Sequence, residues 1–135
     1  MPKPESPEFG TTFDLSVITQ EMKREDAYTR EGHAARTIVR APDLRCVLIA
    51  MQPGGRIAEH VAAATVSIQV LAGRVRIRLP RLARQHEDRF EELAPGRLLV
   101  LDGGIAHTVE AVDETSLLVT LGWPAARSAG ESPAH

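Results

Sequence analysis

One stretch decides the fold, positions 51–79, which reads MQPGGRIAEHVAAATVSIQVLAGRVRIRL. Pro53-Gly54-Gly55 indicates a turn, because proline and glycine favour turn geometries. A lone histidine and a short alanine-rich bend follow. Residues 65–72 are rich in β-branched and aliphatic side chains, which favour a strand. After a turn at Gly73, residues 74–79 alternate arginine with an aliphatic residue, which is typical of a strand with one face in a core and one in water.

The composition is that of one globular domain. The chain has 135 residues, of which 43% are hydrophobic and 25% charged, enough to bury a single core. A net charge of −2 and only 4% aromatic residues argue against a nucleic-acid partner. No apolar run reaches the roughly 18 residues that cross a membrane, and no secretory leader is evident. We therefore expect a cytoplasmic protein without a membrane partner.

The chain divides into three parts by composition. Residues 1–10 carry three prolines among charges and are expected to form a disordered lead-in. Residues 11–124 are expected to form the one domain. Residues 125–135 are rich in alanine, serine, glycine and proline and are expected to be a flexible tail.

The pattern inside the domain predicts strands with one helix. Asp14 could cap a short helix, since Leu15, Ile18 and Met22 would share one face. The polar residues 25–32 predict a loop. Further strands are predicted over 35–40, 44–51, 89–93, 98–101, 107–112 and 116–121. The run 98–101 is continuously apolar, which predicts that both its faces are covered. Short strands with regular glycine and proline turns indicate an all-β sandwich or barrel.

Two motifs in this chain resemble those of the cupin superfamily. The first cupin motif is a glycine, five residues, His-x-His, three or four residues, a glutamate, six residues and a glycine. Gly54, His60 and Gly73 match it. The second is a glycine, five residues, Pro-x-Gly, two residues, a histidine, three residues and an asparagine, which Gly96 and His107 match in spacing. The resemblance spans about 44–121 and implies a double-stranded β-helix, or jelly-roll barrel, with a pocket at its mouth.

The chain departs from these motifs where cupins usually bind metal. Ala62 stands where the second histidine belongs, and Val66 where the glutamate belongs. In the second motif Asp102 replaces the proline and Ala111 the asparagine. Alanine and valine donate no electron pair, whereas a divalent transition metal is held well by three or more protein ligands. We therefore expect no tightly bound metal. Iron, manganese, zinc or nickel on His60 and His107 is the alternative.

Strand parity indicates what replaces the metal site. If His60 points into the barrel, Ala62 shares its face. The register of the resembled family also turns Val66, Ile68 and Val70 inward, opposite His107 and Val109. These positions predict a mostly apolar cavity that could hold a small ligand. The predicted ligand-binding residues are His60, Ala62, Val66, Ile68, His107 and Val109. Alternatively, the two histidines satisfy each other, a backbone group or a trapped water.

The remaining histidines and arginines have simpler interpretations. His33, His86 and His135 lie in polar or terminal segments and are expected to be solvated, although His33 or His86 could fold over the mouth and complete a site. The arginines of 74–79 are expected on the solvent face of their strand. No residue is assigned a catalytic role.

Three functions remain open at this point. The favoured one is a non-catalytic or weakly ligand-binding module. The second is a metal-dependent enzyme of the dioxygenase or isomerase type, with His60, His107 and a third ligand from a loop or substrate. The third is an assembly role, because cupins commonly form homodimers and the apolar runs 98–101 and 117–121 could supply an interface.

Overall fold

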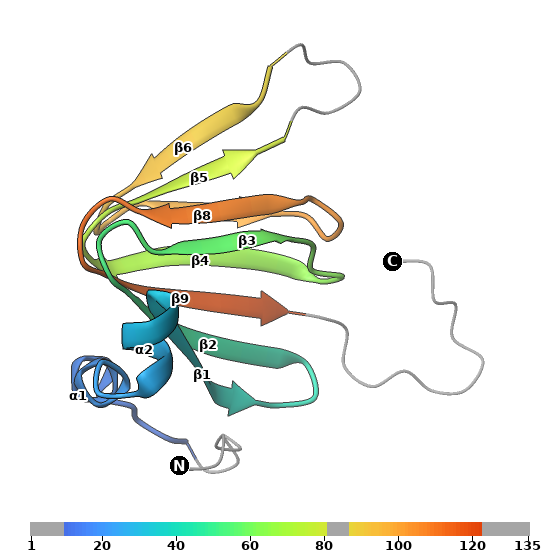
Figure 1. Ribbon diagram of the computed structural model, residues 1–135. Coiled ribbons are helices and arrows are strands. Elements are labelled where there is room, and N and C mark those ends of the chain that lie inside the picture. The colour runs from blue at the N-terminus through green and yellow to red at the C-terminus, as the bar shows by residue number, and fades with distance from the viewer. Residues whose placement is uncertain (1–9, 81–86, 123–135) are drawn as a thin grey trace.

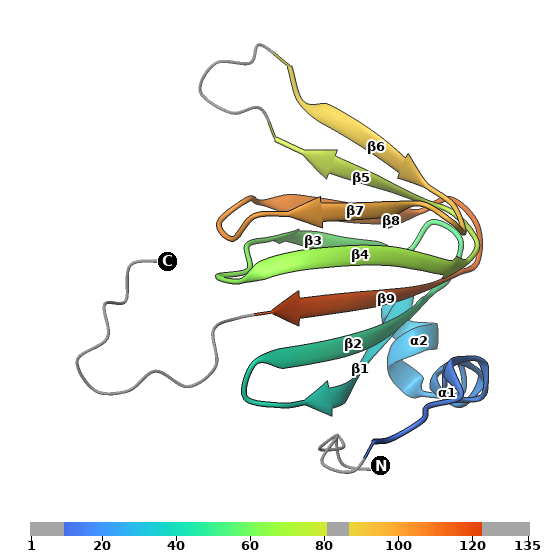
Figure 2. The ribbon, with the colours of Figure 1, turned by 180° about the vertical axis from the view of Figure 1, so that it is seen from behind.

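The computed structural model describes residues 10–80 and 87–122, and of His60 the backbone alone. Two antiparallel sheets face each other (Figures 1 and 2). The five-stranded sheet has the order β1 (His33–Arg40), β2 (Leu44–Met51), β9 (Thr115–Gly122), β4 (Thr65–Ala72) and β7 (Leu98–Leu101). The four-stranded sheet has the order β3 (Arg56–His60), β8 (His107–Ala111), β5 (Val75–Leu79) and β6 (Arg89–Leu93). The prediction of an all-β barrel is confirmed.

The core between the sheets follows the alternation of the strands. Val75, Ile77 and Leu79 of β5 are buried, while Arg74 and Arg76 are exposed. Strand β4 buries every second residue in the same way. Since successive side chains of a strand point to opposite faces, one apolar face per strand closes the core. The predicted solvent face is thus confirmed for Arg74 and Arg76, whereas Arg78 is half-buried.

Two short helices, α1 (Leu15–Met22) and α2 (Asp26–Glu31), cover the outer face of β1 and β2 (Figure 1). The Asp14 carboxylate accepts a hydrogen bond of 3.1 Å from the Val17 N–H and so caps α1, as predicted. Met22 and Leu48 are fully buried in the second core under these helices. Strand β2 is therefore apolar on both faces. It meets the helices on one side and the other sheet on the other.

Helix α2 corrects the prediction of a loop over residues 25–32. The helix has six residues, too few to be stable by propensity alone. Tertiary packing stabilises it, because Tyr28 is only 7% exposed. Gly32 ends it in the left-handed conformation at φ 84°, which glycine adopts without steric cost.

Strand β7 corrects the prediction that the run 98–101 is covered on both faces. Among the described strands it pairs with β4 alone, so it is an edge strand. Leu101 is buried, but Leu98 and Val100 are 60% and 55% exposed. An apolar run alone does not distinguish a central strand from an edge strand, which is why the sequence misled here.

A glycine is required at the end of the molecule where the β4–β5 and β8–β9 turns meet. Gly73 has φ +88°, and a Cβ there would lie 2.2 Å from the backbone oxygen of Glu114. Only glycine fits this approach.

No described helix is long and apolar enough to cross a membrane. The expected lead-in and tail fall largely outside the described residues, and the proposed domain limits stay predictions.

Candidate functional site

A cavity of about 460 Å³ lies between the two sheets. Strands β1, β2, β4 and β9 line it from one sheet, and β3 and β8 from the other. Three of the described lining residues carry ionisable side chains: His33, Glu59 and His107. Every other described lining residue is alanine, valine, isoleucine or leucine. The volume lies within the range of small-molecule sites, which are mostly apolar with a few polar groups.

His107 supplies a buried imidazole to this wall. The residue is 2% exposed, and its Nδ1 lies 3.1 Å from the carbonyl oxygen of Ile105. A carbonyl oxygen can only accept, so Nδ1 carries the proton and donates. In the neutral ring Nε2 then carries a lone pair, so it accepts hydrogen bonds. The local backbone thus sets the polarity that His107 offers.

The turn before His107 packs directly on the segment after β3. The Gly104 N–H donates a 2.8 Å hydrogen bond to the Ala62 carbonyl. A Cβ on Gly103 would lie 2.4 Å from the Ala63 carbonyl oxygen. Since no side chain fits there, glycine is required for the two turns to meet. This contact holds the start of β8 against the segment that carries Ala62.

Strand β3 contains an irregularity beside the site. Ile57 pairs with Val109, but His60 pairs with His107, so one extra residue lies on the β3 side. Such a bulge breaks the alternation of side chains. Ala58 and Glu59 both line the cavity as a result. His60 is the register partner of His107, and its predicted place in the pocket stays a prediction, because its side chain is not described.

The other predicted site residues gather at the cavity. Val66, Ile68 and Val109 are buried and line it, and half-buried Ala62 joins them. Val70, which the register turned inward, lies in the core and is not among the lining residues. The geometry therefore brings together the described part of the predicted set. Whether these residues bind a ligand stays a prediction.

Among the three ionisable lining residues, the predicted site set lacked two. His33 begins β1 and lines the cavity. It was expected to be solvated, with closure of the site as the alternative, and it lies two residues before Ala35, on the same strand face. Extending the predicted strand back by two residues would have found it. Glu59 could not be found by parity, because a bulge is not visible in the alternation. His86 and His135 lie outside the described residues.

The described residues do not fit the metal centre that the cupin resemblance implies. Val66 is buried in the cavity wall where the motif has its glutamate, and Ala62 lines it where the motif has a histidine. Within residues 10–80 and 87–122, the described side chains form no group of three or more His, Cys, Asp or Glu that could hold a metal ion. The aliphatic side chains at these two positions supply no donor atoms to a coordination shell.

Comparisons with known proteins find likeness in structure but not in sequence. The sequence matches no family model and no curated protein. The structure is similar to a conserved protein of unknown function from Streptococcus pyogenes, with a TM-score of 0.67 and 24% identity over 93% of this chain and 98% of that one.

Two further solved structures are similar over the barrel. A cupin superfamily protein from Desulfitobacterium hafniense has a TM-score of 0.59 and 13% identity, over 68% of this chain and 78% of that chain. The formate complex of oxalate decarboxylase from Lactobacillus farciminis has a TM-score of 0.62 and 22% identity. There the likeness covers 70% of this chain but 29% of the decarboxylase. These likenesses show the fold and leave the activity open.

Proposed function

We propose that this chain, which has the cupin fold, is a non-catalytic binding module for a small, mostly apolar molecule. The observation that carries the proposal is the aliphatic cavity of about 460 Å³ with a backbone-fixed imidazole in its wall. Each methylene buried against such walls contributes about 0.8 kcal/mol. The apolar walls therefore supply the affinity for such a molecule.

The cavity wall favours binding over metal catalysis. A metal-dependent dioxygenase or isomerase needs its ion held by several donor side chains. In this wall Ala62 and Val66 supply none. A ligand held by contact with the aliphatic walls needs no ion.

A binding experiment with a neutral apolar probe tests the proposal. Prodan, a neutral naphthyl ketone, emits more strongly and at shorter wavelength in an apolar site. We expect the wild type to bind it and Ala62→Phe, which fills the cavity, to lose binding. Ala72→Phe is the matched control, because Ala72 is exposed at the end of β4 and does not line the cavity.

Two results would contradict this function. One is an absence of Prodan binding by the wild type. The other is equal binding by Ala62→Phe. Binding should also survive dialysis against a chelator. Loss of binding on dialysis, with recovery when iron, manganese, zinc or nickel is returned, would favour the metal-dependent alternative with His60 and His107 as ligands.

We also propose that the chain forms a homodimer through β7. Leu98 and Val100 expose apolar surface on an edge strand whose outer backbone groups pair with no described strand. Unguarded edges of this kind add a further strand readily. A second copy can offer the same strand across a twofold axis, which makes the contact self-complementary.

Light scattering tests the dimer. We expect a dimeric mass for the wild type and a monomeric mass for Val100→Lys. Val17→Lys is the control, since Val17 is 53% exposed on α1, away from β7. A monomeric wild type at high concentration would remove the proposal.

A further inference from the structure

The cavity wall on the five-stranded sheet follows a diagonal across the strands. Four of its lining residues mark the path: Val66, Val119, Ile49 and His33. They stand on four strands that are neighbours in the order β4-β9-β2-β1. The register sets each residue two positions farther along the strands than the one before it. Because directly opposite residues and residues two apart share one sheet face, the four side chains form one oblique row, which we call the diagonal row.

The cavity does not spread over the rest of this sheet face. Val70 and Thr115 lie on one side of the diagonal row; both are 2% exposed, and neither lines the cavity. Leu99 lies on the same side, since it pairs with Ile68 of β4, and it does not line the cavity either. The same holds for Thr37 on the other side of the row. The cavity therefore follows the row.

The diagonal row is long. From Val66 to His33 it crosses three strand spacings and advances six residues along the strands, a distance of roughly 20 to 25 Å. An extended chain advances about 1.2 Å per bond, so a hydrocarbon of about 16 carbons would cover this distance. The cavity volume of about 460 Å³ is drawn out over the same length. The cavity is therefore much longer than it is wide.

The side chains along the row offer hydrocarbon contacts. Apart from His33 at one end, every described lining residue of the five-stranded sheet is alanine, valine, isoleucine or leucine. A sugar or a nucleotide would bury hydroxyl groups against these side chains without hydrogen-bond partners, which costs free energy. The long middle of an occupant must therefore be apolar, whatever group it carries at an end.

We infer that the cavity binds a single unbranched alkyl chain, which lies along the diagonal row from Val66 to His33. The inference rests on the proposed binding function and names the class of its ligand. An alkyl chain is long and narrow and carries no polar group along its length, so it matches both the shape and the chemistry of the row. A sugar ring or a small carboxylate matches neither.

A series of 1-alkanols that displace Prodan tests the inference. Every methylene that becomes buried improves binding about fourfold. We expect the wild type to show this gain for each added carbon from hexanol to dodecanol, with each alkanol below its solubility limit. An affinity that stops rising by octanol would overturn the inference, because a compact cavity is full at that length.

The variant Ile49→Trp should shorten the row. Ile49 is half-buried and stands in the middle of the row. A tryptophan side chain there leaves the part from Val66 to Val47, roughly 12 Å, which is about the length of octanol. We expect hexanol to bind as it does to the wild type, and dodecanol to bind at least about tenfold more weakly, because the gain per carbon stops near octanol.

The matched control is Leu99→Trp. Leu99 is also half-buried on the same sheet face and packs against the same core, but it does not line the cavity. This variant should keep the wild-type gain through dodecanol. Equal weakening of dodecanol by both variants would contradict the diagonal path, and so would an unchanged series in a folded Ile49→Trp. Circular dichroism reports whether each variant folds, and the wild-type series decides the inference if Ile49→Trp does not.

The outcomes separate this inference from the proposed function. If the wild type binds Prodan, Ala62→Phe does not, and the alkanol affinity stops rising by octanol, the alkyl chain is wrong and the binding function stands. If the wild type does not bind Prodan at all, the binding function fails and the inference fails with it.

Discussion

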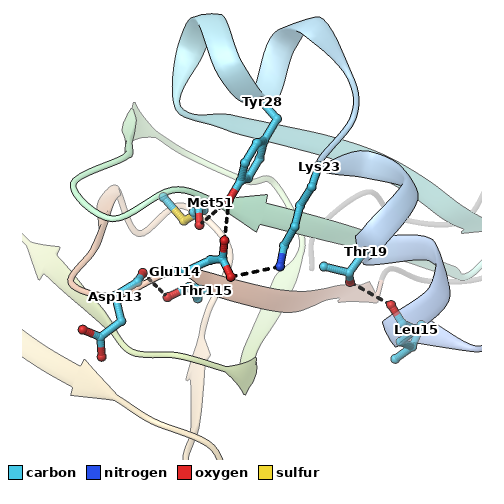
Figure 3. A network of polar contacts seen from close by, with 8 residues as sticks. All are labelled: Leu15, Thr19, Lys23, Tyr28, Met51, Asp113, Glu114 and Thr115. Carbon is cyan, nitrogen blue, oxygen red and sulfur yellow. Dashed lines mark hydrogen bonds and ion pairs between the residues drawn. The ribbon is translucent and has the colours of Figure 1, made fainter.

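Two buried polar groups differ in their hydrogen bonding. The Thr115 hydroxyl, where the β8–β9 turn meets β4 and β5, has partners, whereas one nitrogen of His33 in the cavity wall has none among the described residues. The Thr115 hydroxyl accepts from the Arg74 N–H at 3.1 Å and lies 2.8 Å from the Asp113 carbonyl oxygen, to which it can donate. Figure 3 shows this contact beside the Tyr28–Glu114–Lys23 network. The enclosed nitrogen of His33 has no partner among the described residues. Satisfied polar groups fix a fold, whereas an unsatisfied buried group costs stability.

The network in Figure 3 extends the hydrogen-bonded region around Thr115 to the helices. The Tyr28 hydroxyl donates to the Glu114 carboxylate at 3.3 Å, and Lys23 lies 3.1 Å from the other carboxylate oxygen. Gln52 donates a 2.6 Å bond to the Tyr28 carbonyl. These contacts fasten α1 and α2 to the turn end of the sheets. We therefore expect changes there to act on stability, and changes at the cavity to act on the proposed binding.

The largest expected effect is a loss of stability at the turn that packs against Thr115. Gly73→Ala forces a Cβ to within 2.7 Å of the Thr115 Cα, and closer to the Glu114 oxygen. Both are backbone atoms that cannot move aside, so we expect a loss of about 3 kcal/mol in the free energy of unfolding, measured in urea. Gly96→Ala is the control: its φ is +97° but nothing lies within 4 Å, so about 1 kcal/mol is expected. Equal losses would contradict the steric argument.

Removal of one hydroxyl should have the next largest effect. Thr115→Val keeps the shape but leaves the Arg74 N–H without this acceptor. Thr115 is 2% exposed, so we expect a loss of about 2 kcal/mol in urea unfolding. Thr65→Val, at an exposed position of β4, should change stability by less than about 0.5 kcal/mol. A neutral Thr115→Val would mean that water replaces the hydroxyl.

A smaller effect of the opposite sign is expected in the cavity wall. His33→Phe removes the unpartnered Nδ1, so the free protein should gain up to about 1 kcal/mol in unfolding free energy. If His33→Phe were instead less stable than the wild type, His33 would stabilise the fold, and the contrast with Thr115 would be wrong.

The smallest expected effect is a pH dependence of stability that arises from Tyr28. Burial, with the charge and hydrogen bond of Glu114, raises the pKa of Tyr28 above its usual 10.0. The folded protein then holds this proton more tightly than the unfolded chain. Stability should therefore be fully present below pH 10 and fall as the pH rises above it. Tyr28→Phe should flatten this alkaline fall in urea titrations. An identical fall in the variant would assign it to other groups.

The sequence predicted most of the fold because its signals are local. The alternation in 74–79 and the capping carboxylate of Asp14 act within a few residues, and both predictions are confirmed. The same holds for the strand over 44–51, which is β2 as observed. The loop predicted over 25–32 was wrong, because the burial of Tyr28 by distant strands stabilises α2.

The candidate site could be predicted only where residues follow a regular strand. Val66, Ile68 and Val109 were expected in one cavity by register, and they line it. Glu59 escaped because the β3 bulge breaks the alternation. His33 escaped because the predicted strand began at residue 35, two residues after the start of β1.

The sequence by itself determined the strands, the turns and the loss of donor side chains at two motif positions. Those properties depend on residue type and on neighbours along the chain. Only the tertiary structure decided that two histidines from different sheets share one apolar cavity, that one His33 nitrogen is enclosed without a partner, and that β7 lies at an edge. These depend on which strands meet across the barrel, and such long-range pairing leaves no local trace in the sequence.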